Sequence, residues 1–301
     1  TPTPAAGSAF TGWSGGGGTC TGTGSCFLTV GAATTLTATF DPPTIATPRL
    51  ANISTRMQVL TGDDVLIGGF VIQGTASKTV VVRARGPSLI PFGIANALVN
   101  PVLQLFSGPT QVAINDDWGT AANAAAVTTS GFAPGNALES AILMTLAPGA
   151  YTGIVTGAGG ATGVGIIEVF EVDQPGVPLA NISTRGRVLT GNDVMIGGFV
   201  IQGTQPQTVV VRARGPSLIP FGIANALGDP VLQLFTGATP ITSNDNWQTA
   251  TNAAAIQASG FAPSNAAESA ILITLAPGAY TAIVTGAGNT TGVGIIEVFA
   301  Q

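Results

Sequence analysis

Two acidic turns carry most of the side chains that could bind a metal ion or transfer a proton. The first set is Asn115, Asp116, Asp117 and Glu139, and the second is Asn244, Asp245, Asn246 and Glu268. Clustered carboxylate and amide oxygens suit Ca²⁺, which takes six to eight oxygen ligands. The alternative is an Asx turn, in which the side chains cap local backbone groups. The sequence thus offers two candidate calcium sites and implies no other cofactor.

Paired carboxylates also perform glycoside hydrolysis, and Asp116 or Asp117 with Glu139 is the pair with the best case. The chain has no histidine, which excludes Ser-His-Asp and Cys-His catalytic sites. A small β-sandwich also leaves little room for a substrate cleft. We therefore expect a protein that is not an enzyme.

Charged and aromatic residues on the strands suggest structural roles or sugar binding. The arginines Arg83, Arg85, Arg212 and Arg214 could bind an anionic sugar. We expect them instead to form ion pairs with Glu168 and Glu297, because so scarce a charge on a strand is seldom left unpaired. Trp118 and Trp247 follow the acidic turns, where they either stack on a sugar ring or cover the end of the sandwich.

The composition of the chain indicates which classes of partner to expect. Only 8% of the residues are charged and the net charge is −5, which argues against nucleic acid. The apolar stretches are interrupted by Pro and Gly, so we expect no membrane span. Weak electrostatic repulsion between molecules favours association.

Cys20 and Cys26 are the two cysteines of the chain, with five residues between them. This spacing is not the C-x-x-C of a redox pair. Their setting is a loop rich in Gly and Thr, so we expect a small disulfide in a protein that is extracellular or at the cell surface.

A tandem repeat fills most of the chain. Residues 50–170 align without a gap with residues 179–299, and 27 of the 121 aligned positions differ. A unit this long can bury its own core, so the repeat predicts two domains. The expected organisation is an N-terminal unit (1–41), a linker (42–49), copy 1 (50–172), a second linker (173–178) and copy 2 (179–301).

Short runs rich in β-branched residues predict strands within each copy. In copy 1 these are Val65–Ile72, Thr79–Arg85, Val102–Phe106, Ala141–Leu146, Tyr151–Thr156 and Gly165–Phe170, with one short helix within 120–129. Many short strands without a long amphipathic helix indicate antiparallel sandwiches. The predicted fold is all-β: two tandem jelly-roll-like sandwiches and a small N-terminal unit with a disulfide.

The segment from Asn100 to Asp173, with "NPVLQLF", "INDDW" and "LAPGAYT", resembles the bacterial pre-peptidase C-terminal domains. That resemblance implies a non-catalytic jelly roll on a secreted bacterial protein. The front of each copy, "LANISTR" to "VVVRARGPSL", is similar to part of a tandem module of large secreted bacterial proteins, and no activity is associated with it.

The segment from Phe10 to Phe40 resembles the second half of the divergent β-grasp repeat of bacterial surface proteins. The resemblance rests on "FTGWSG", the two cysteines and the ending "TATF". It implies a partial repeat whose unpaired strand edges attract a partner.

Together these features lead us to expect a non-catalytic extracellular structural protein. It would assemble with copies of itself into a fibre, matrix or surface layer through strand edges or head-to-tail contacts between domains. The alternative is a carbohydrate-binding accessory region of a secreted hydrolase, with polysaccharide as its partner.

Overall fold

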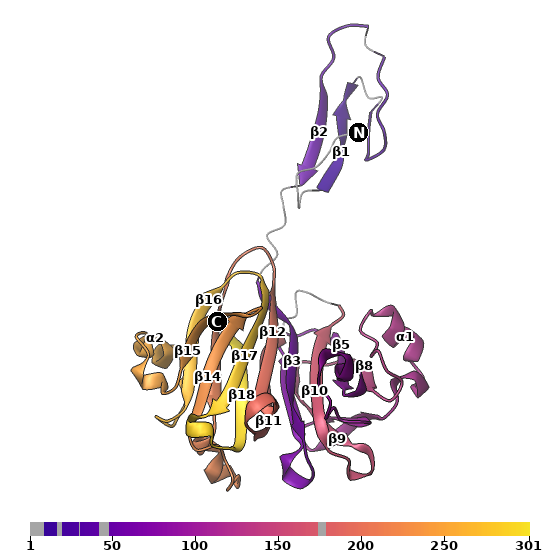
Figure 1. The fold of residues 1–301 in the computed structure, drawn as a ribbon. Helices are drawn as coiled ribbons and strands as arrows, with labels where there is room; N and C mark the ends of the chain where they lie inside the picture. Colours follow the sequence, from indigo (N-terminus) through magenta and orange to yellow (C-terminus); the bar gives the residue numbers. More distant parts are fainter. Residues whose placement is uncertain (1–8, 17–19, 30, 42–47, 174–178) are drawn as a thin grey trace. The chain divides into compact units, whose positions relative to one another are not determined.

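The computed structural model describes residues 9–16, 20–29, 31–41, 48–173 and 179–301, which belong to two compact units, Thr1–Thr47 and Pro48–Gln301 (Figure 1). Most of the two expected linkers, 42–47 and 174–178, lies outside the described residues.

The N-terminal unit is a two-stranded antiparallel sheet of β1 (Ala9–Gly15) and β2 (Leu36–Asp41). Aromatic rings gather on this hairpin: the Phe10 ring lies 5.2 Å from that of Trp13 and 5.5 Å from that of Phe40. Such a small sheet buries little apolar surface, so local contacts of this kind and a disulfide must hold it.

Besides short 3-10 helices, each repeat copy contributes eight strands and one short α-helix to the second unit. In copy 1 they are β3 (Arg49–Val59), β4 (Leu66–Ile72), β5 (Lys78–Arg85), β6 (Pro101–Ser107), β7 (Thr110–Asn115), α1 (Ala124–Thr129), β8 (Ser140–Leu146), β9 (Gly149–Gly157) and β10 (Gly163–Glu171). In copy 2 they are β11 (Leu179–Val188), β12 (Met195–Gln202), β13 (Gln207–Arg214), β14 (Pro230–Thr236), β15 (Thr239–Asn244), α2 (Ala253–Ala258), β16 (Ser269–Leu275), β17 (Gly278–Gly286) and β18 (Gly292–Ala300).

These strands form two antiparallel sheets of eight, and each sheet runs through both copies. One sheet has the order β8-β5-β10-β3-β12-β17-β14-β15. The other has the order β16-β13-β18-β11-β4-β9-β6-β7. Each copy is thus a sandwich of four strands on four, and the two sandwiches are joined side by side.

The predicted all-β fold with two sandwiches and a small disulfide-containing N-terminal unit is confirmed. All six strands predicted in copy 1 are present, with ends shifted by at most two residues, and the predicted helix is α1. The sequence did not predict β3 and β7.

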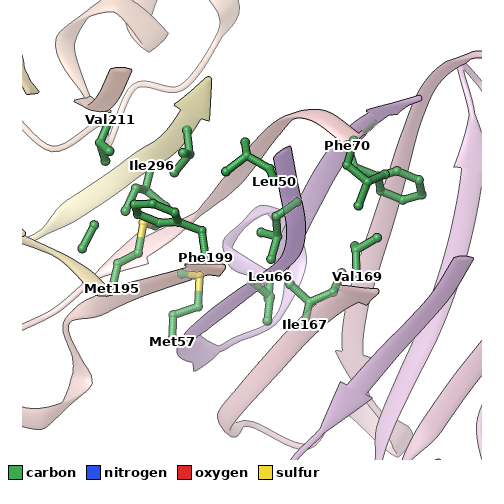
Figure 2. Packing of buried hydrophobic residues seen from close by; sticks show 14 of the residues in the cluster. Leu50, Met57, Leu66, Phe70, Ile167, Val169, Met195, Phe199, Val211 and Ile296 are labelled. Atoms are coloured by element: carbon green, nitrogen blue, oxygen red, sulfur yellow. The ribbon is translucent and has the colours of Figure 1, made fainter. Parts of the chain in front are cut away.

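One hydrophobic cluster runs between the sheets from copy 1 into copy 2. Figure 2 shows Met57 and Leu66 of copy 1 in the same cluster as Met195 and Phe199 of copy 2. The segments 50–172 and 179–301 are therefore units of sequence that share their sheets and their core.

Candidate functional site

The contact between the two copies, which we call the seam, consists of two strand pairs. β3 of copy 1 pairs with β12 of copy 2, and β4 of copy 1 pairs with β11 of copy 2. In a copy standing alone, all four strands would be sheet edges with unpaired backbone N–H and C=O groups. The seam satisfies these groups and makes both sheets continuous. Figure 1 shows β12 beside β3 in the middle of the larger unit.

Equivalent residues of the two copies meet at the centre of the seam. Leu50 pairs with Leu179, and the Oγ1 atoms of Thr55 and Thr184 are hydrogen-bonded at 2.7 Å in a fully buried position. Both pairs are separated by 129 residues, the offset of the repeat. A local two-fold axis along the strands, with β3 and β11 on either side, accounts for these contacts between like residues.

Glycines allow the strands of the seam to approach closely. A Cβ atom added to Gly69 would lie 2.8 Å from Ser183 Oγ, and one added to Gly198 would lie 2.7 Å from Ser54 Oγ. In each case the serine comes from the opposite copy, so the "IGGF" sequence of β4 and β12 is fitted to the seam.

Polar contacts close both ends of the seam. At one end, the Arg49 Nη2 donates to Gln202 Oε1 at 2.7 Å. At the other end, Arg187 Nη1 lies 3.1 Å from Asp64 Oδ2 in an ion pair. Near this second end, Asn96 donates to Asp193 at 3.2 Å and Asn225 donates to Asp64 at 3.3 Å. All four contacts join residues of different copies.

The expected arginine–glutamate contacts lie on the outer face of each sandwich. Arg83 Nε and Arg85 Nε lie 2.6 and 2.8 Å from Glu168 Oε2. Arg83 also donates to the carbonyl oxygen of Phe132 and covers the ring of Phe170, which stacks on Phe132 at 4.3 Å. Copy 2 repeats this arrangement with Arg212, Arg214, Glu297, Phe261 and Phe299. The arginines are thus engaged within the fold.

Glu139 and Glu268 are completely buried and bind backbone. The Glu139 Oε1 accepts hydrogen bonds from the N–H groups of Gly86 and Ser88, each at 2.9 Å, while its Oε2 has no hydrogen-bond partner. Glu268 has the same contacts in copy 2. The sequence placed these carboxylates with the acidic turns, whereas the structure uses them to hold the turn after β5 or β13.

Asn115 and Asn244 reach across to neighbouring strands. The Asn115 Oδ1 accepts from the N–H of Ala141 on β8 at 2.9 Å, and its Nδ2 donates to the Asp117 carbonyl oxygen. Asn244 does the same with Ala270 and Asn246. Their amides are therefore engaged with backbone, and only the second contact is local, as in the Asx turn that is the alternative to a calcium site.

The acidic turns differ in charge between the copies. In copy 1, Asn100, with its amide oriented to satisfy its neighbours, donates to Asp116 Oδ1 and to the Leu138 carbonyl oxygen, both at 2.9 Å. Copy 2 has Asp229 at the equivalent position, facing Asp245. Burial, then the charge of Asp245 and a hydrogen bond with it, raise the pKa of Asp229 above its ordinary value.

Calcium gains no support from this geometry. Within the part of the chain that the structure describes, no three acidic or cysteine side chains lie together as they would around a metal ion. The residues of each expected ligand set lie apart, because Glu139 and Glu268 bind the turn after β5 or β13, whereas Asn115 and Asn244 bind β8 or β16. Asp117 Oδ1 is buried without a hydrogen-bond partner, but one oxygen atom is no binding site.

The tryptophans cover the sandwich ends. Trp247 is only 7% exposed and packs with Ile256 and Ala270, and its Nε1 donates to the carbonyl oxygen of Asn265. Trp118 is half-buried and donates to Asn136 in the same way. Of the two roles considered for these rings, burial favours covering the sandwich over stacking on a sugar.

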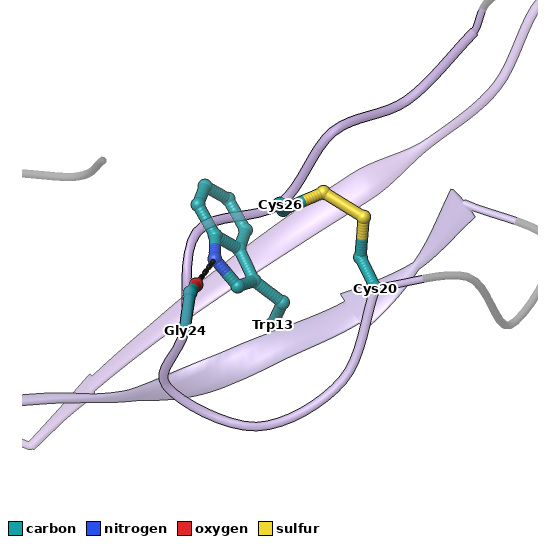
Figure 3. The surroundings of a disulfide bond; sticks show 4 residues. All are labelled: Trp13, Cys20, Gly24 and Cys26. Carbon is teal, nitrogen blue, oxygen red and sulfur yellow. Dashed lines mark hydrogen bonds between the residues drawn. A yellow bond between two sulfur atoms is a disulfide. The ribbon is translucent and has the colours of Figure 1, made fainter.

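The disulfide joins Cys20 and Cys26 as expected. Trp13 lies beside it, and its indole N–H donates to the carbonyl oxygen of Gly24 at 3.0 Å (Figure 3). The ring and the disulfide together hold the loop between the cysteines.

Copy 1 contains a cluster of charged residues that the sequence did not predict. Lys78, the single lysine of the chain, is fully buried with its Nζ 3.1 Å from Glu171 Oε2, and Glu171 also binds Arg49 at 2.6 Å. Copy 2 has Gln207 and Ala300 at the positions of Lys78 and Glu171. That difference between two nearly identical copies was the available signal.

The cluster borders a cavity of about 430 Å³ lined by residues of both copies, among them Asn52, Phe132, Phe170, Val200 and Gln202.

None of the described helices is long and apolar enough to cross a membrane.

No protein-family model and no curated protein matches the chain. Among solved structures, it is similar to a DUF4785 family protein from Legionella pneumophila, with a TM-score of 0.26 and 8% sequence identity over 85% of this chain and 81% of that chain. So low a score carries no argument, and the all-β architecture rests on the two sheets described above.

Proposed function

We propose that this protein is a non-catalytic, extracellular structural protein that assembles with copies of itself into a fibre or a surface layer. The observation that carries the proposal is the seam, because it joins two nearly identical sandwiches edge to edge into continuous sheets. The same chemistry between molecules makes an extended assembly. Glu139 binds backbone N–H groups and Glu168 binds arginine, so these carboxylates hold the fold together and few acidic groups remain for catalysis.

The disulfide and the family resemblances also support a secreted structural protein. Disulfides persist in oxidising compartments, which favours a secreted or surface location. The resemblance of each copy to pre-peptidase C-terminal domains, and of the N-terminal unit to a partial β-grasp repeat, supports a secreted bacterial origin. In the N-terminal unit, Phe27 is 89% exposed, so it offers apolar surface to a partner.

Electron microscopy of the purified full-length chain at high concentration tests the proposal. We expect filaments or ordered sheets, and light scattering that rises with protein concentration. Dispersed monomers across concentrations and salt conditions would show that the protein is not a self-assembling one.

A carbohydrate-binding role is the second candidate, favoured by the cavity beside the stacked rings of Phe132 and Phe170. Its polar lining includes Arg49, Asn52 and Gln202, which suit sugar hydroxyl groups. A polysaccharide pull-down that is lost in Phe132→Ala, and retained in the copy 2 counterpart Phe261→Ala, would support this role. No binding by the wild-type chain would remove it.

A further inference from the structure

The sheets of the Pro48–Gln301 unit end in four edge strands, which differ in how their unpaired backbone groups are protected. Side chains cap two of them: the N–H of Ala141 on β8 donates to Asn115, and the N–H of Ala270 on β16 donates to Asn244, both at 2.9 Å. No hydrogen bond of the described residues joins a side chain to the backbone of β7 or to that of β15 before its last residue. These two strands therefore need another form of protection if they are to stay unpaired.

Copy 2 protects β15 by its sequence. Four of the six residues of β15 differ from their counterparts in β7, although only 27 of 121 positions differ between the copies. Pro240 stands where β7 has Gln111, and proline has no N–H group to offer to another strand. Ser243 stands where β7 has Ile114, so β15 also lacks the apolar surface that strand pairing would bury. Proline on an edge strand hinders pairing with another chain.

The strand β7 lacks this protection and exposes apolar side chains. Ile114 is 56% exposed and Val112 is 37% exposed. Ala113 between them is half-buried and packs against the hydrophobic cluster, so the two larger side chains lie on the outer face of the sheet. Both β7 and β15 contain a β-bulge, at Val112 and at Ile241, so the bulge does not distinguish them. Of the four edges, β7 is thus the one that is uncapped, uncharged, apolar and free of proline.

We propose that β7 is a docking edge for β7 of a second molecule of this protein. Antiparallel pairing centred on Ala113 places Ala113 against its own counterpart and Ile114 of each chain opposite Val112 of the other. The exposed aliphatic side chains then form one cluster on the outer face, and the sheet that ends in β7 continues into the second molecule. In this register Asp116, which follows β7, falls opposite Thr110 and away from its own counterpart.

The partner is a second molecule because the described part of the Pro48–Gln301 unit offers β7 no other strand. All strands except the four edges are paired on both sides, β8 and β16 are capped, and β15 contains Pro240. An uncharged strand that pairs with itself also brings like molecules together without repulsion. The contact is two-fold symmetric and closes as a dimer. The inference rests on the proposed function, because this dimer is the repeating unit of the proposed assembly.

Disulfide trapping with Ala113→Cys in the full-length chain tests the contact. The native cysteines are bonded to each other, so the variant adds one free thiol at the two-fold axis. We expect a covalent dimer on a non-reducing gel after mild oxidation, because opposite residues of antiparallel strands lie close enough for a disulfide. A mixture of chains carrying Val112→Cys and chains carrying Ile114→Cys is a second pair for the same register.

Thr242→Cys is the matched control, because it occupies the position of Ala113 in β15. Thr242 is exposed whereas Ala113 is half-buried, so chance collisions between molecules favour the control. We expect the control to give only a background of covalent dimers. Equal dimer yields from Ala113→Cys and Thr242→Cys would show that the cross-link does not report a specific contact, and would overturn the proposal.

Exchange of edge residues between the copies tests why β7 pairs and β15 does not. Gln111→Pro/Ile114→Ser gives β7 the residues that the same fold holds in β15. In sedimentation at concentrations below those that give filaments, this variant should raise the dissociation constant of the dimer by about tenfold or more, with an unchanged melting temperature.

The reverse exchange, Pro240→Gln/Ser243→Ile, should create a second docking edge. β7 and β15 lie at opposite ends of the unit, so a chain with two self-pairing edges should form open chains longer than a dimer. A reverse variant that stays at the size of the wild-type protein would contradict the roles assigned to these residues.

The outcomes separate this inference from the proposed function. Filaments that persist in Gln111→Pro/Ile114→Ser, without covalent dimers of Ala113→Cys, would leave the structural function intact and overturn the β7 contact. A dimer that is lost in the double variant but gives none of the expected cross-links would place another segment on β7 and overturn pairing of β7 with itself. Monomers alone in sedimentation and in microscopy would overturn both proposals.

Discussion

Single side chains set the ends of the sandwiches, and the two acidic residues before β8 and β16 show how. Glu139 is buried yet accepts two backbone N–H groups, so it fixes the turn that starts at Gly86. Gly86 is needed there because a Cβ atom would lie 1.9 Å from the Leu98 carbonyl oxygen. The sequence shows a glutamate before an apolar strand, but it does not show which backbone groups the carboxylate will meet.

Asp229→Asn should stabilise the Pro48–Gln301 unit at neutral pH. The pKa of Asp229 is raised above 3.8 in the folded state, first by burial and then by Asp245. The raised pKa means that Asp229 stabilises the folded state at a pH below its unfolded-state pKa. That contribution to stability is lost as the pH rises through the folded-state pKa. Removing one of two facing carboxylates should add roughly 0.5 kcal/mol at pH 7, the scale of a solvent-screened pair. Urea unfolding at pH 7 and pH 3.5 measures the difference, which should shrink at the lower pH.

Asn100→Asp provides the reciprocal control in copy 1. It places a carboxylate against Asp116, where the wild-type amide donates a hydrogen bond, and should destabilise the unit at pH 7. An Asp229→Asn variant no more stable than wild type at pH 7 would contradict the like-charge interpretation of the pair.

Strands that end a sheet behave differently from strands at the seam. Asn115, Asn123 and their copy 2 counterparts occupy backbone groups of β8 and β16, whereas β3, β4, β11 and β12 are paired on both sides. The fold therefore caps two of its four outer edge strands, β8 and β16, and pairs its inner ones, whereas β7 and β15 end their sheets without such caps among the contacts of the described residues. A β-sandwich without such caps exposes templates for aggregation.

Removing the caps should promote disordered aggregation. Asn244→Ala/Asn252→Ala uncovers the N–H of Ala270 and the carbonyl oxygen of Leu272. We expect a loss of about 1 kcal/mol of stability for each lost hydrogen bond. We also expect faster growth of light scattering and thioflavin T fluorescence than for wild type. The control is Gln104→Ala, which loses an exposed side-chain hydrogen bond to Gln111 without uncovering an edge. Equal aggregation of the two variants would show that the asparagines do not protect the edge.

Strand prediction succeeded where the pattern within one copy was sufficient. β5 and β10 are rich in β-branched residues and pair within their own copy, so their sequences identify them. β3 was missed because asparagine, serine and arginine alternate with its buried residues. Its second neighbour in the sheet is β12 of copy 2. This strand is the equivalent of β4 and lies 129 residues beyond it in the sequence. The seam therefore could not be predicted from one copy, although the duplication predicted that two sandwiches exist.

At the scale of the whole chain, the two compact units differ in what stabilises them. Pro48–Gln301 has one hydrophobic cluster that spans both copies, so we expect both sandwiches to unfold in one transition. The N-terminal unit depends on its disulfide and a few aromatic contacts. Removing the short loop closure should cost it about 2 kcal/mol.

Reduction of the disulfide should therefore destabilise the N-terminal unit alone. Trp13 reports on this unit by fluorescence, and Trp118 and Trp247 report on the other. Variants that keep only Trp13, or only Trp118 and Trp247, follow the two units separately during heating with and without a reductant. A large shift in the transition of the Pro48–Gln301 unit on reduction, or separate transitions of the two copies, would contradict this assignment.

The buried contact between Thr55 and Thr184 on the two-fold axis has an evolutionary consequence. In a symmetric dimer of separate chains, one gene encodes both sides, so every substitution near the axis appears twice and meets itself. Once both halves belong to one polypeptide, each side changes alone. A large residue on one side and glycine on the other, as at Met57 and Gly186, then becomes available to selection. In a single polypeptide, the residues on the two sides of the axis can therefore differ, as Met57 and Gly186 do.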